Sequence, residues 1–131
     1  MIGIVVITHS SLAYEFIKAA EMIVGSADQL QAVSIDRSIG IETVQHHMRE
    51  VLDEVGRDGD GIIILTDMFG GTPTNVSAEF LKAGQVEIVT GVNLPMLLKS
   101  ISAREGKTVG ELAELLKDYG QKAVMRPAEM L

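Results

Sequence analysis

Four short runs rich in β-branched residues alternate with amphipathic segments along the chain, and this alternation limits the folds that are possible. The runs are Met1–Thr8, Gln31–Ile35, Gly61–Leu65 and Val86–Thr90. Between them apolar residues recur at helical spacing, most regularly over Ile41–Val55. Strands that alternate with helices in this way predict an α/β fold, with a doubly wound, mainly parallel sheet and helices on both faces.

Local signals predict where the helices begin and end. Glycine adopts the left-handed conformation that closes many helices, and four glycines follow apolar-periodic segments. They are Gly25, Gly84, Gly106 and Gly120. Thr108 and Glu111 have the spacing of a capping box at the start of the last helix. After that helix, Gln121–Arg126 is predicted to form a short strand at the edge of the sheet, bounded by Pro127.

The composition favours one cytoplasmic domain over residues 1–131, with no cofactor. The chain has 131 residues, of which 47% are hydrophobic, enough for a core of its own. It has no cysteine, so disulfides and thiolate chemistry are excluded. Its formal net charge of −7 opposes binding to nucleic acid and to anionic membranes. The apolar run Ile4–Ile7 is too short to span a bilayer and follows no basic segment, so we expect no membrane insertion.

The segment Thr66–Asn75 has the composition of a binding loop. It follows a strand expected to be buried on both faces and leads directly into a helix. Gly70 and Gly71 permit a tight turn. Thr72 is a candidate cap for the helix, and Pro73 suits its first position. The free N–H groups at a helix start favour a bound anion, as does the positive end of the helix dipole.

His9 follows the first strand in the same way that Asp67 follows the third. In the flavodoxin-like strand order 2-1-3-4 these strands are neighbours, and ligands bind beyond their carboxyl ends. We therefore expect His9 and Asp67 to converge. A carboxylate that accepts the proton of one imidazole nitrogen leaves a lone pair on the other, which suits attack on a phosphoryl group. Candidate donors to the phosphoryl oxygens are Ser10, Ser11, Thr72 and the N–H groups of Gly70 and Gly71.

Ordinary structural roles are the alternatives for these and several other polar residues. The alternative for His9 is a histidine that ends a strand without a functional role, and the alternative for Asp67 is an aspartate that caps a turn. Only the expected pairing of the two residues favours a functional site. His46 and His47 lie within a helix without a third ligand, so we expect surface residues and no metal site. Arg37, in the loop after the second strand, is either a phosphate contact or a solvated side chain.

The methionines divide into two groups. Met22, Met48 and Met96 fall on apolar helix faces, where core filling is the expected role. Met68 lies instead beside Phe69 on the candidate binding loop, where exposed apolar side chains would form part of a docking surface.

Taken together, these residues resemble the IIA component of the mannose family of the bacterial sugar phosphotransferase system. The similarity extends over essentially the whole chain. Three motifs carry it, namely Gly3–His9, Thr66–Asn75 and Thr90–Leu97.

The resemblance implies a role for each of the main site residues. His9 would be the phosphohistidine, which accepts a phosphoryl group from the phosphocarrier HPr and passes it to a IIB component. Asp67 would orient the imidazole, and Thr72 would hold a phosphoryl oxygen. The family's sheet ends in an antiparallel strand that is exchanged within a homodimer, and this implies the same role for Gln121–Arg126.

Several other functions remain open from the sequence. A protein of this kind serves a sugar transporter or acts as a stand-alone regulatory phosphoprotein, and the phosphotransferase subunit of dihydroxyacetone kinase is a related alternative. A non-catalytic nucleotide-binding module would use the same crevice, although the chain has no Gly-x-Gly-x-x-Gly or P-loop pattern. An aspartyl-phosphate receiver needs acidic residues after the first strand, where this chain has Thr8–Ser11.

Overall fold

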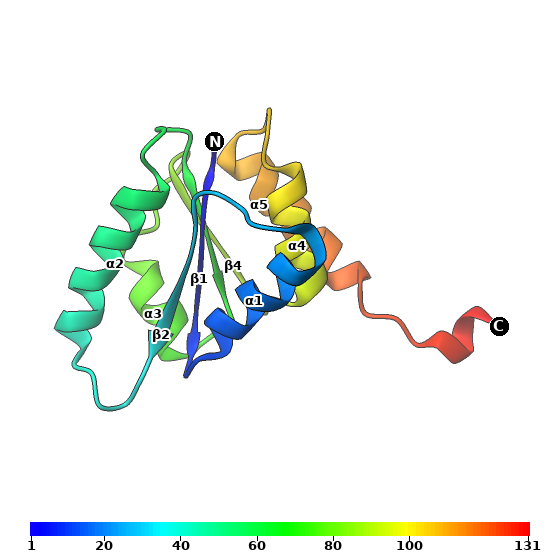
Figure 1. Cartoon of the computed structure of the whole chain (residues 1–131), viewed down its shortest axis with the longest axis horizontal. Helices are drawn as coiled ribbons and strands as arrows, with labels where there is room; N and C mark the ends of the chain where they lie inside the picture. Colours follow the sequence, from blue (N-terminus) through cyan, green and yellow to red (C-terminus); the bar gives the residue numbers. More distant parts are fainter.

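A sheet of four parallel strands forms the centre of the computed structural model, which describes residues 1–131 (Figure 1). The strands are β1 (Gly3–His9), β2 (Leu30–Ile35), β3 (Ile62–Thr66) and β4 (Val86–Thr90). Their order is β2-β1-β3-β4, and all three neighbouring pairs are parallel. The predicted α/β class and strand order are therefore confirmed.

Helices cover both faces of this sheet, as predicted (Figure 1). They are α1 (Leu12–Val24), α2 (Ile41–Val55), α3 (Thr72–Ala78), α4 (Leu94–Ala103) and α5 (Val109–Lys122). Alternate residues of β1 enter two separate cores. Ile4 and Val6 pack with α1, α4 and α5, whereas Val5 and Ile7 pack with α2 and α3. Burial on both faces explains why β1 is an unbroken apolar run rather than an alternating one.

The helix ends agree with the sequence signals at some positions and differ at others. Gly25, with φ 82°, closes α1 as predicted. The capping box is also present: the Glu111 N–H donates to Thr108 Oγ1 at 3.1 Å, and the Thr108 N–H donates to Glu111 Oε1 at 3.0 Å. In contrast, α4 ends at Ala103 rather than near Gly106.

The prediction that α3 continues to Gly84 is wrong, because the helix ends at Ala78. Ser77 Oγ donates to the Pro73 carbonyl at 2.7 Å, a local bond that competes with helix propagation. Beyond the helix, the Lys82 N–H donates to the Val86 carbonyl at 3.1 Å, so these residues pair in an antiparallel bridge instead of a further helical turn.

The predicted edge strand Gln121–Arg126 is also not formed. Residues 121 and 122 belong to the end of α5, and 124–126 have no regular structure. Gly120 lies inside α5 instead of closing it. The last turn, η1 (Pro127–Met130), projects from the body of the molecule, so no strand of the same chain lies beside it to supply the hydrogen bonds of a ladder (Figure 1). We call residues 124–131 the C-terminal tail.

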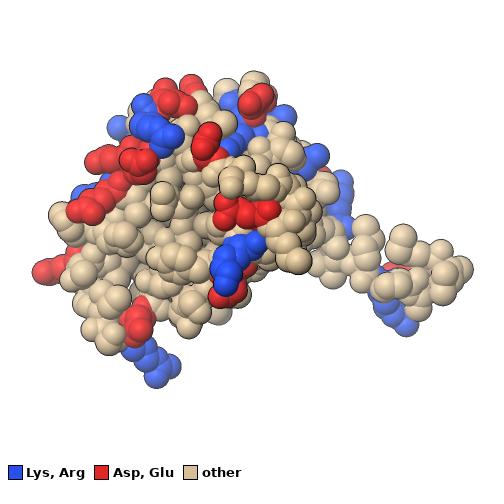
Figure 2. Space-filling model, viewed as in Figure 1, with Lys and Arg blue, Asp and Glu red and all other residues tan.

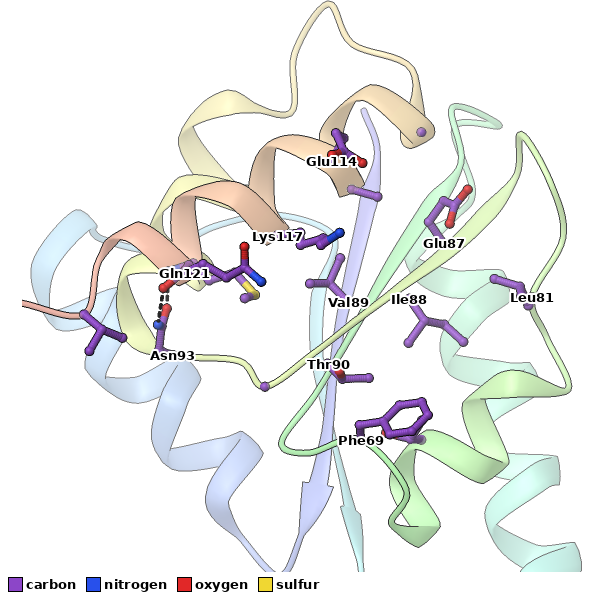
Figure 3. A pocket seen from close by; sticks show the side chains of 17 residues that line it. Phe69, Leu81, Glu87, Ile88, Val89, Thr90, Asn93, Glu114, Lys117 and Gln121 are labelled. Atoms are coloured by element: carbon purple, nitrogen blue, oxygen red, sulfur yellow. Dashed lines mark hydrogen bonds between the residues drawn. The ribbon is translucent and has the colours of Figure 1, made fainter.

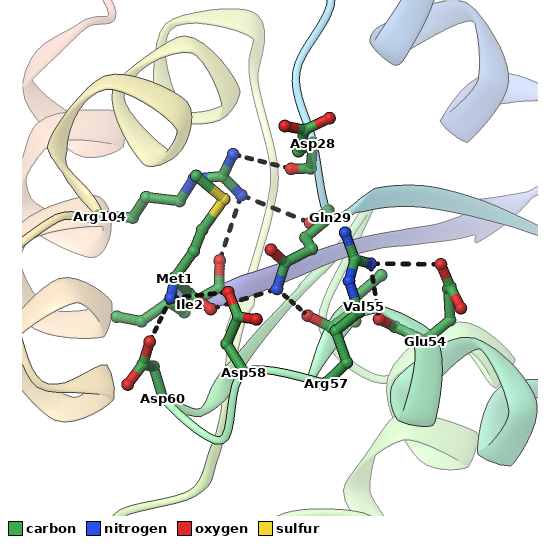
Figure 4. A network of polar contacts seen from close by, with 10 residues as sticks. All are labelled: Met1, Ile2, Asp28, Gln29, Glu54, Val55, Arg57, Asp58, Asp60 and Arg104. Carbon is green, nitrogen blue, oxygen red and sulfur yellow. Dashed lines mark hydrogen bonds and ion pairs between the residues drawn. The ribbon is translucent and has the colours of Figure 1, made fainter.

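A polar network joins the amino ends of the strands to α4 (Figure 4). Arg104, only 4% exposed, donates to the carbonyls of Ile2, Asp28 and Gln29 at 3.1, 2.7 and 3.4 Å. Burial lowers the pKa of this guanidinium, and three carbonyl acceptors offset part of the cost of desolvating the charge. The N-terminal ammonium pairs with two carboxylates of the loop before β3, those of Asp58 and Asp60. These contacts tie the amino ends of the strands to α4 and to the loop before β3.

Candidate functional site

His9 and Asp67 meet at the carboxyl edge of the sheet. His9 is the last residue of β1, Asp67 follows β3, and these two strands are paired. His9 Nδ1 lies 2.8 Å from Asp67 Oδ2, and the backbone N–H of His9 donates to the same oxygen at 3.0 Å. The His9 side chain is 48% exposed and that of Asp67 is 12% exposed. The ring is therefore held from the protein side and open to solvent on the other.

The charge on Asp67 is stabilised by these two contacts. Burial raises the pKa of its carboxyl group, but the hydrogen bonds from the His9 backbone and ring outweigh burial and bring the pKa below the ordinary aspartate value. An ionised carboxylate can only accept at Nδ1, so Nδ1 carries the proton, and in the neutral form of the ring Nε2 presents a lone pair. An imidazole with one nitrogen held by a carboxylate and the other unprotonated is able to act as a nucleophile.

Buried hydroxyl groups hold the loop that carries Asp67. Thr74 Oγ1 donates to the Met68 carbonyl at 2.6 Å and lies 2.8 Å from Thr66 Oγ1. These bonds connect the end of β3, the loop and the first turn of α3. Sequence reasoning missed Thr66 and Thr74, although a threonine at the end of a buried strand and another just inside the next helix are a signal for such a bond.

The glycines of the loop have different environments. Gly70 has φ +87°, a left-handed conformation that favours glycine, and no atom lies within 4 Å of a Cβ built there. Gly71, not the predicted Thr72, is the N-cap residue of α3. A Cβ built on Gly71 would lie 2.7 Å from His9 Cε1. Thr72 is the first residue of α3 and is exposed, and its side chain makes no hydrogen bond within the chain, so its hydroxyl is free for another partner.

Ser10 and Ser11 are exposed immediately after His9. Ser10 has φ 53°, an uncommon left-handed value for a residue with a side chain, and it turns the chain from β1 into α1. Ser11 is the N-cap of α1 but makes no capping hydrogen bond. That bond comes instead from Thr8, whose Oγ1 accepts the Ala13 N–H at 2.7 Å. Thr8 is a further supporting residue that the sequence did not reveal.

No hydrogen bond or ion pair joins the remaining candidates to this pair. Arg37 is exposed in the turn after β2 and forms no ion pair. His46 and His47 are exposed on α2, and His46 Nε2 is 2.9 Å from Glu50 Oε1. No group of three or more histidine, aspartate or glutamate side chains could hold a metal ion.

Exposed apolar side chains surround the carboxyl edge. Met68 and Phe69 are 53% and 81% exposed. Further exposed apolar residues on segments that follow β1 and β2 are Leu12, Ile39 and Ile41. Figure 2 shows acidic side chains along α2 and few charges over α3 and the adjoining loop. Met22, predicted to fill the core, is instead 90% exposed at the end of α1.

A groove of about 840 Å³ lies between β4 and α5 (Figure 3). One wall consists of residues 87–91, which form most of β4 and the residue after it. The other wall is the face of α5 that carries Glu114 and Lys117. Phe69 stands at one end of it near Thr90, and Val124 of the tail also lines it. The groove therefore reaches the candidate loop but does not include His9.

None of the helices is both long and apolar enough to cross a membrane. Comparison with known proteins identifies a family. Residues 3–117 match the family model EIIA-man, described as the PTS system fructose IIA component. PTS denotes the phosphotransferase system named above.

Individual proteins agree with this match over nearly the whole chain. The fructose-specific EIIA component of Bacillus subtilis is 31% identical over 132 residues, which cover 100% of this chain and 90% of that protein. The sorbose-specific EIIA component of Lacticaseibacillus casei is 32% identical over 114 residues, or 86% and 81% of the two chains. The crystal structure of a PTS IIA protein associated with the fucose utilization operon of Streptococcus pneumoniae has a TM-score of 0.85 and 30% identity, covering 98% and 94% of the two chains. The chain therefore belongs to the EIIA-man family, the mannose-type IIA components of the sugar phosphotransferase system.

Proposed function

We propose that residues 1–131 act as one domain that carries a phosphoryl group on His9, received from phospho-HPr and delivered to a IIB component. The observation that carries the proposal is the 2.8 Å contact between His9 Nδ1 and Asp67 Oδ2 beside an exposed ring. With Nδ1 protonated, Nε2 is the attacking atom. A P–N bond forms at Nε2 while the bond from phosphorus to the donor breaks, and the electrons of the broken bond stay with the donor. Transfer to IIB reverses these steps.

The surface around His9 supports proteins, rather than small molecules, as donor and acceptor. The ring is open to solvent, and the exposed apolar side chains around it suit contact with another protein. We propose that Met68 and Phe69 contact HPr and IIB when the phosphoryl group is exchanged. Ser10, Ser11, Thr72 and the N–H groups of Gly70 and Gly71 are the proposed donors to the phosphoryl oxygens.

The decisive experiment is phosphorylation by phospho-HPr. The protein should gain one phosphate per chain that is labile in acid and stable in alkali, as a phosphoramidate is, and His9→Gln should abolish it. His47→Gln is the matched control, because His47 is an exposed histidine on α2 outside the site, and it should be phosphorylated normally. Phosphate that persists in His9→Gln would place the acceptor at another residue, and phosphate that is labile in alkali would indicate an acyl phosphate on a carboxylate such as that of Asp67; either result would overturn the proposal.

We propose further that the protein is a homodimer in which each C-terminal tail occupies the groove of the other copy. β4 is an edge strand, so beyond Val86, which bonds to Lys82, its outer N–H and C=O groups have no partner strand. The tail carries matching apolar side chains, with Val124 and Met125 at 78% and 63% exposure. Symmetric exchange covers both surfaces and closes without a free edge.

A further inference from the structure

Gly71 is in contact with the imidazole ring of His9. A Cβ built on Gly71 would lie 2.7 Å from His9 Cε1 and 3.3 Å from His9 Nε2. The first of these distances is shorter than real Cβ atoms show. The backbone of Gly71, with φ −91° and ψ 171°, is open to any residue. A side chain at this position is therefore incompatible with the observed place of the ring, although the backbone conformation would allow one.

The ring has few other restraints. Asp67 Oδ2 holds Nδ1, whereas almost half of the side-chain surface is open to solvent. Gly71 borders the part of the ring next to Nδ1, where a Cβ built on it would meet Cε1 first and then Nε2. Asp67 thus holds the ring at Nδ1, and the absence of a side chain at Gly71 leaves free the space that Cε1 and Nε2 occupy in this position of the ring.

We infer that Gly71 is a positioning residue: the absence of its side chain seats the His9 ring against Asp67 and keeps space open at Nε2. The second part rests on the proposed phosphocarrier function, since that space is where the phosphoryl group would be attached. The role is distinct from donating a backbone N–H to phosphate, which an alanine at this position would still do.

A methyl group at Gly71 should disturb the site more than the fold. The atoms that it meets belong to a half-exposed side chain, which can move, and not to a buried backbone. The displaced ring would lose its 2.8 Å contact with Asp67, and the preference for a proton on Nδ1 would weaken. A displacement on the order of 1 Å at a reacting atom can lower a rate by about 10²-fold.

Gly71→Ala is tested beside Gly40→Ala. Gly40 is likewise the N-cap glycine of a helix, with φ −68° and ψ 151°, but a Cβ built on it would have no atom within 4 Å. The first measurement is ¹⁵N–¹H NMR of the His9 ring without phosphate, which reports which nitrogen carries the proton. The second is the rate of phosphoryl transfer from phospho-HPr. We expect Gly71→Ala to reduce the Nδ1–H form and to slow transfer by about 10²-fold, while Gly40→Ala changes neither.

The outcomes separate this inference from the proposed function. A Gly71→Ala protein with the parent's ring spectrum and transfer rate, or one that only matches Gly40→Ala, overturns the inference. If the unaltered protein accepts no phosphate while Gly71→Ala alone shifts the ring proton, the phosphocarrier proposal fails and the positioning role stands.

A double variant covers the case in which Gly71→Ala does not fold. In a His9→Ala background the added methyl group meets no ring, so Gly71→Ala should then lower the melting temperature no more than Gly40→Ala does. An equally large loss of stability in that background would place the clash elsewhere and refute the role.

Discussion

One carboxylate oxygen of Asp67 accepts two hydrogen bonds from His9, from the backbone N–H at 3.0 Å and from Nδ1 at 2.8 Å. Asp67→Asn keeps the shape of the side chain but presents either an oxygen or an NH₂ group to the ring, so the ring proton is no longer fixed on Nδ1. We expect phosphoryl transfer to slow by about 10²-fold with the fold retained. Rapid-quench kinetics with phospho-HPr, beside circular dichroism, measure both effects. Unchanged kinetics in a folded Asp67→Asn protein would leave Asp67 as a turn residue only.

The lowered pKa of Asp67 also predicts how stability depends on pH. A carboxyl group whose pKa is lower in the folded than in the unfolded protein stabilises the fold above its ordinary pKa, about 4. That contribution disappears as the pH falls through the lowered value. The difference in free energy of unfolding between the protein and Asp67→Asn should thus be constant near pH 6 and shrink below about pH 4. Urea unfolding over this range tests it, and a difference that persists unchanged in acid contradicts it.

Residue positions can be predicted where topology alone decides them. His9 and Asp67 end two strands that the order 2-1-3-4 makes neighbours, so their approach follows from the sequence once the strands are recognised. Thr8, Thr66 and Thr74 cannot be found in this way, because their hydrogen bonds depend on side-chain rotamers inside a packed loop. The contact between Gly71 and the ring is likewise a matter of tenths of an ångström, which no sequence pattern specifies.

Among the elements, α1 depends on a cap that lies in the preceding strand. Thr8 is fully buried, and its Oγ1 accepts the N–H of Ala13, which is also buried, at 2.7 Å. Thr8→Val keeps the shape but leaves that N–H without an acceptor, which should lower the free energy of unfolding by about 1–3 kcal/mol. Ser11→Ala is the control, since the Ser11 side chain makes no cap bond, and it should change stability by less than about 0.5 kcal/mol. Equal losses in urea unfolding would assign no special role to Thr8.

Helices with a regular apolar spacing of their own can be predicted from the sequence. The ends of elements that depend on bonds to other segments cannot. α2 runs over Ile41–Val55 as its apolar spacing indicates, and its buried residues are those on one face. α3 is shorter than its apolar residues suggest, because Ser77 bonds back to Pro73 and Lys82 pairs with Val86. The sequence predicts a strand at the start of the tail, yet a strand exists only where another strand supplies its hydrogen bonds, and a single chain brings none to it.

At the scale of the whole molecule, the tail is the testable part of the proposed assembly. A chain that stops after Ala123 keeps all of α5 and removes only the projecting residues. Light scattering should give about twice the chain mass of 14.1 kDa for the full-length protein and a single chain mass for the truncated one. Helix content by circular dichroism should be nearly equal in the two.

A point variant separates the tail from exposed apolar surface in general. Met125→Glu places a charge in the exchanged segment and should weaken the dimer, whereas Met22→Glu alters an exposed methionine on α1, outside the groove, and should not. A monomeric full-length protein, or a truncated protein that remains dimeric, would rule the exchange out.

Phe69 belongs both to the groove between β4 and α5 and to the loop that begins with Asp67. Thermodynamic linkage then sets a rule for the molecule. If a ligand in the groove changes the equilibrium constant for phosphorylation of His9 by some factor, phosphorylation of His9 must change the affinity for that ligand by the same factor. Each increment of about 1.4 kcal/mol in the coupling free energy changes both equilibrium constants tenfold. The phosphorylation level of the protein and the occupancy of its groove are therefore not independent variables if this shared loop responds to either one.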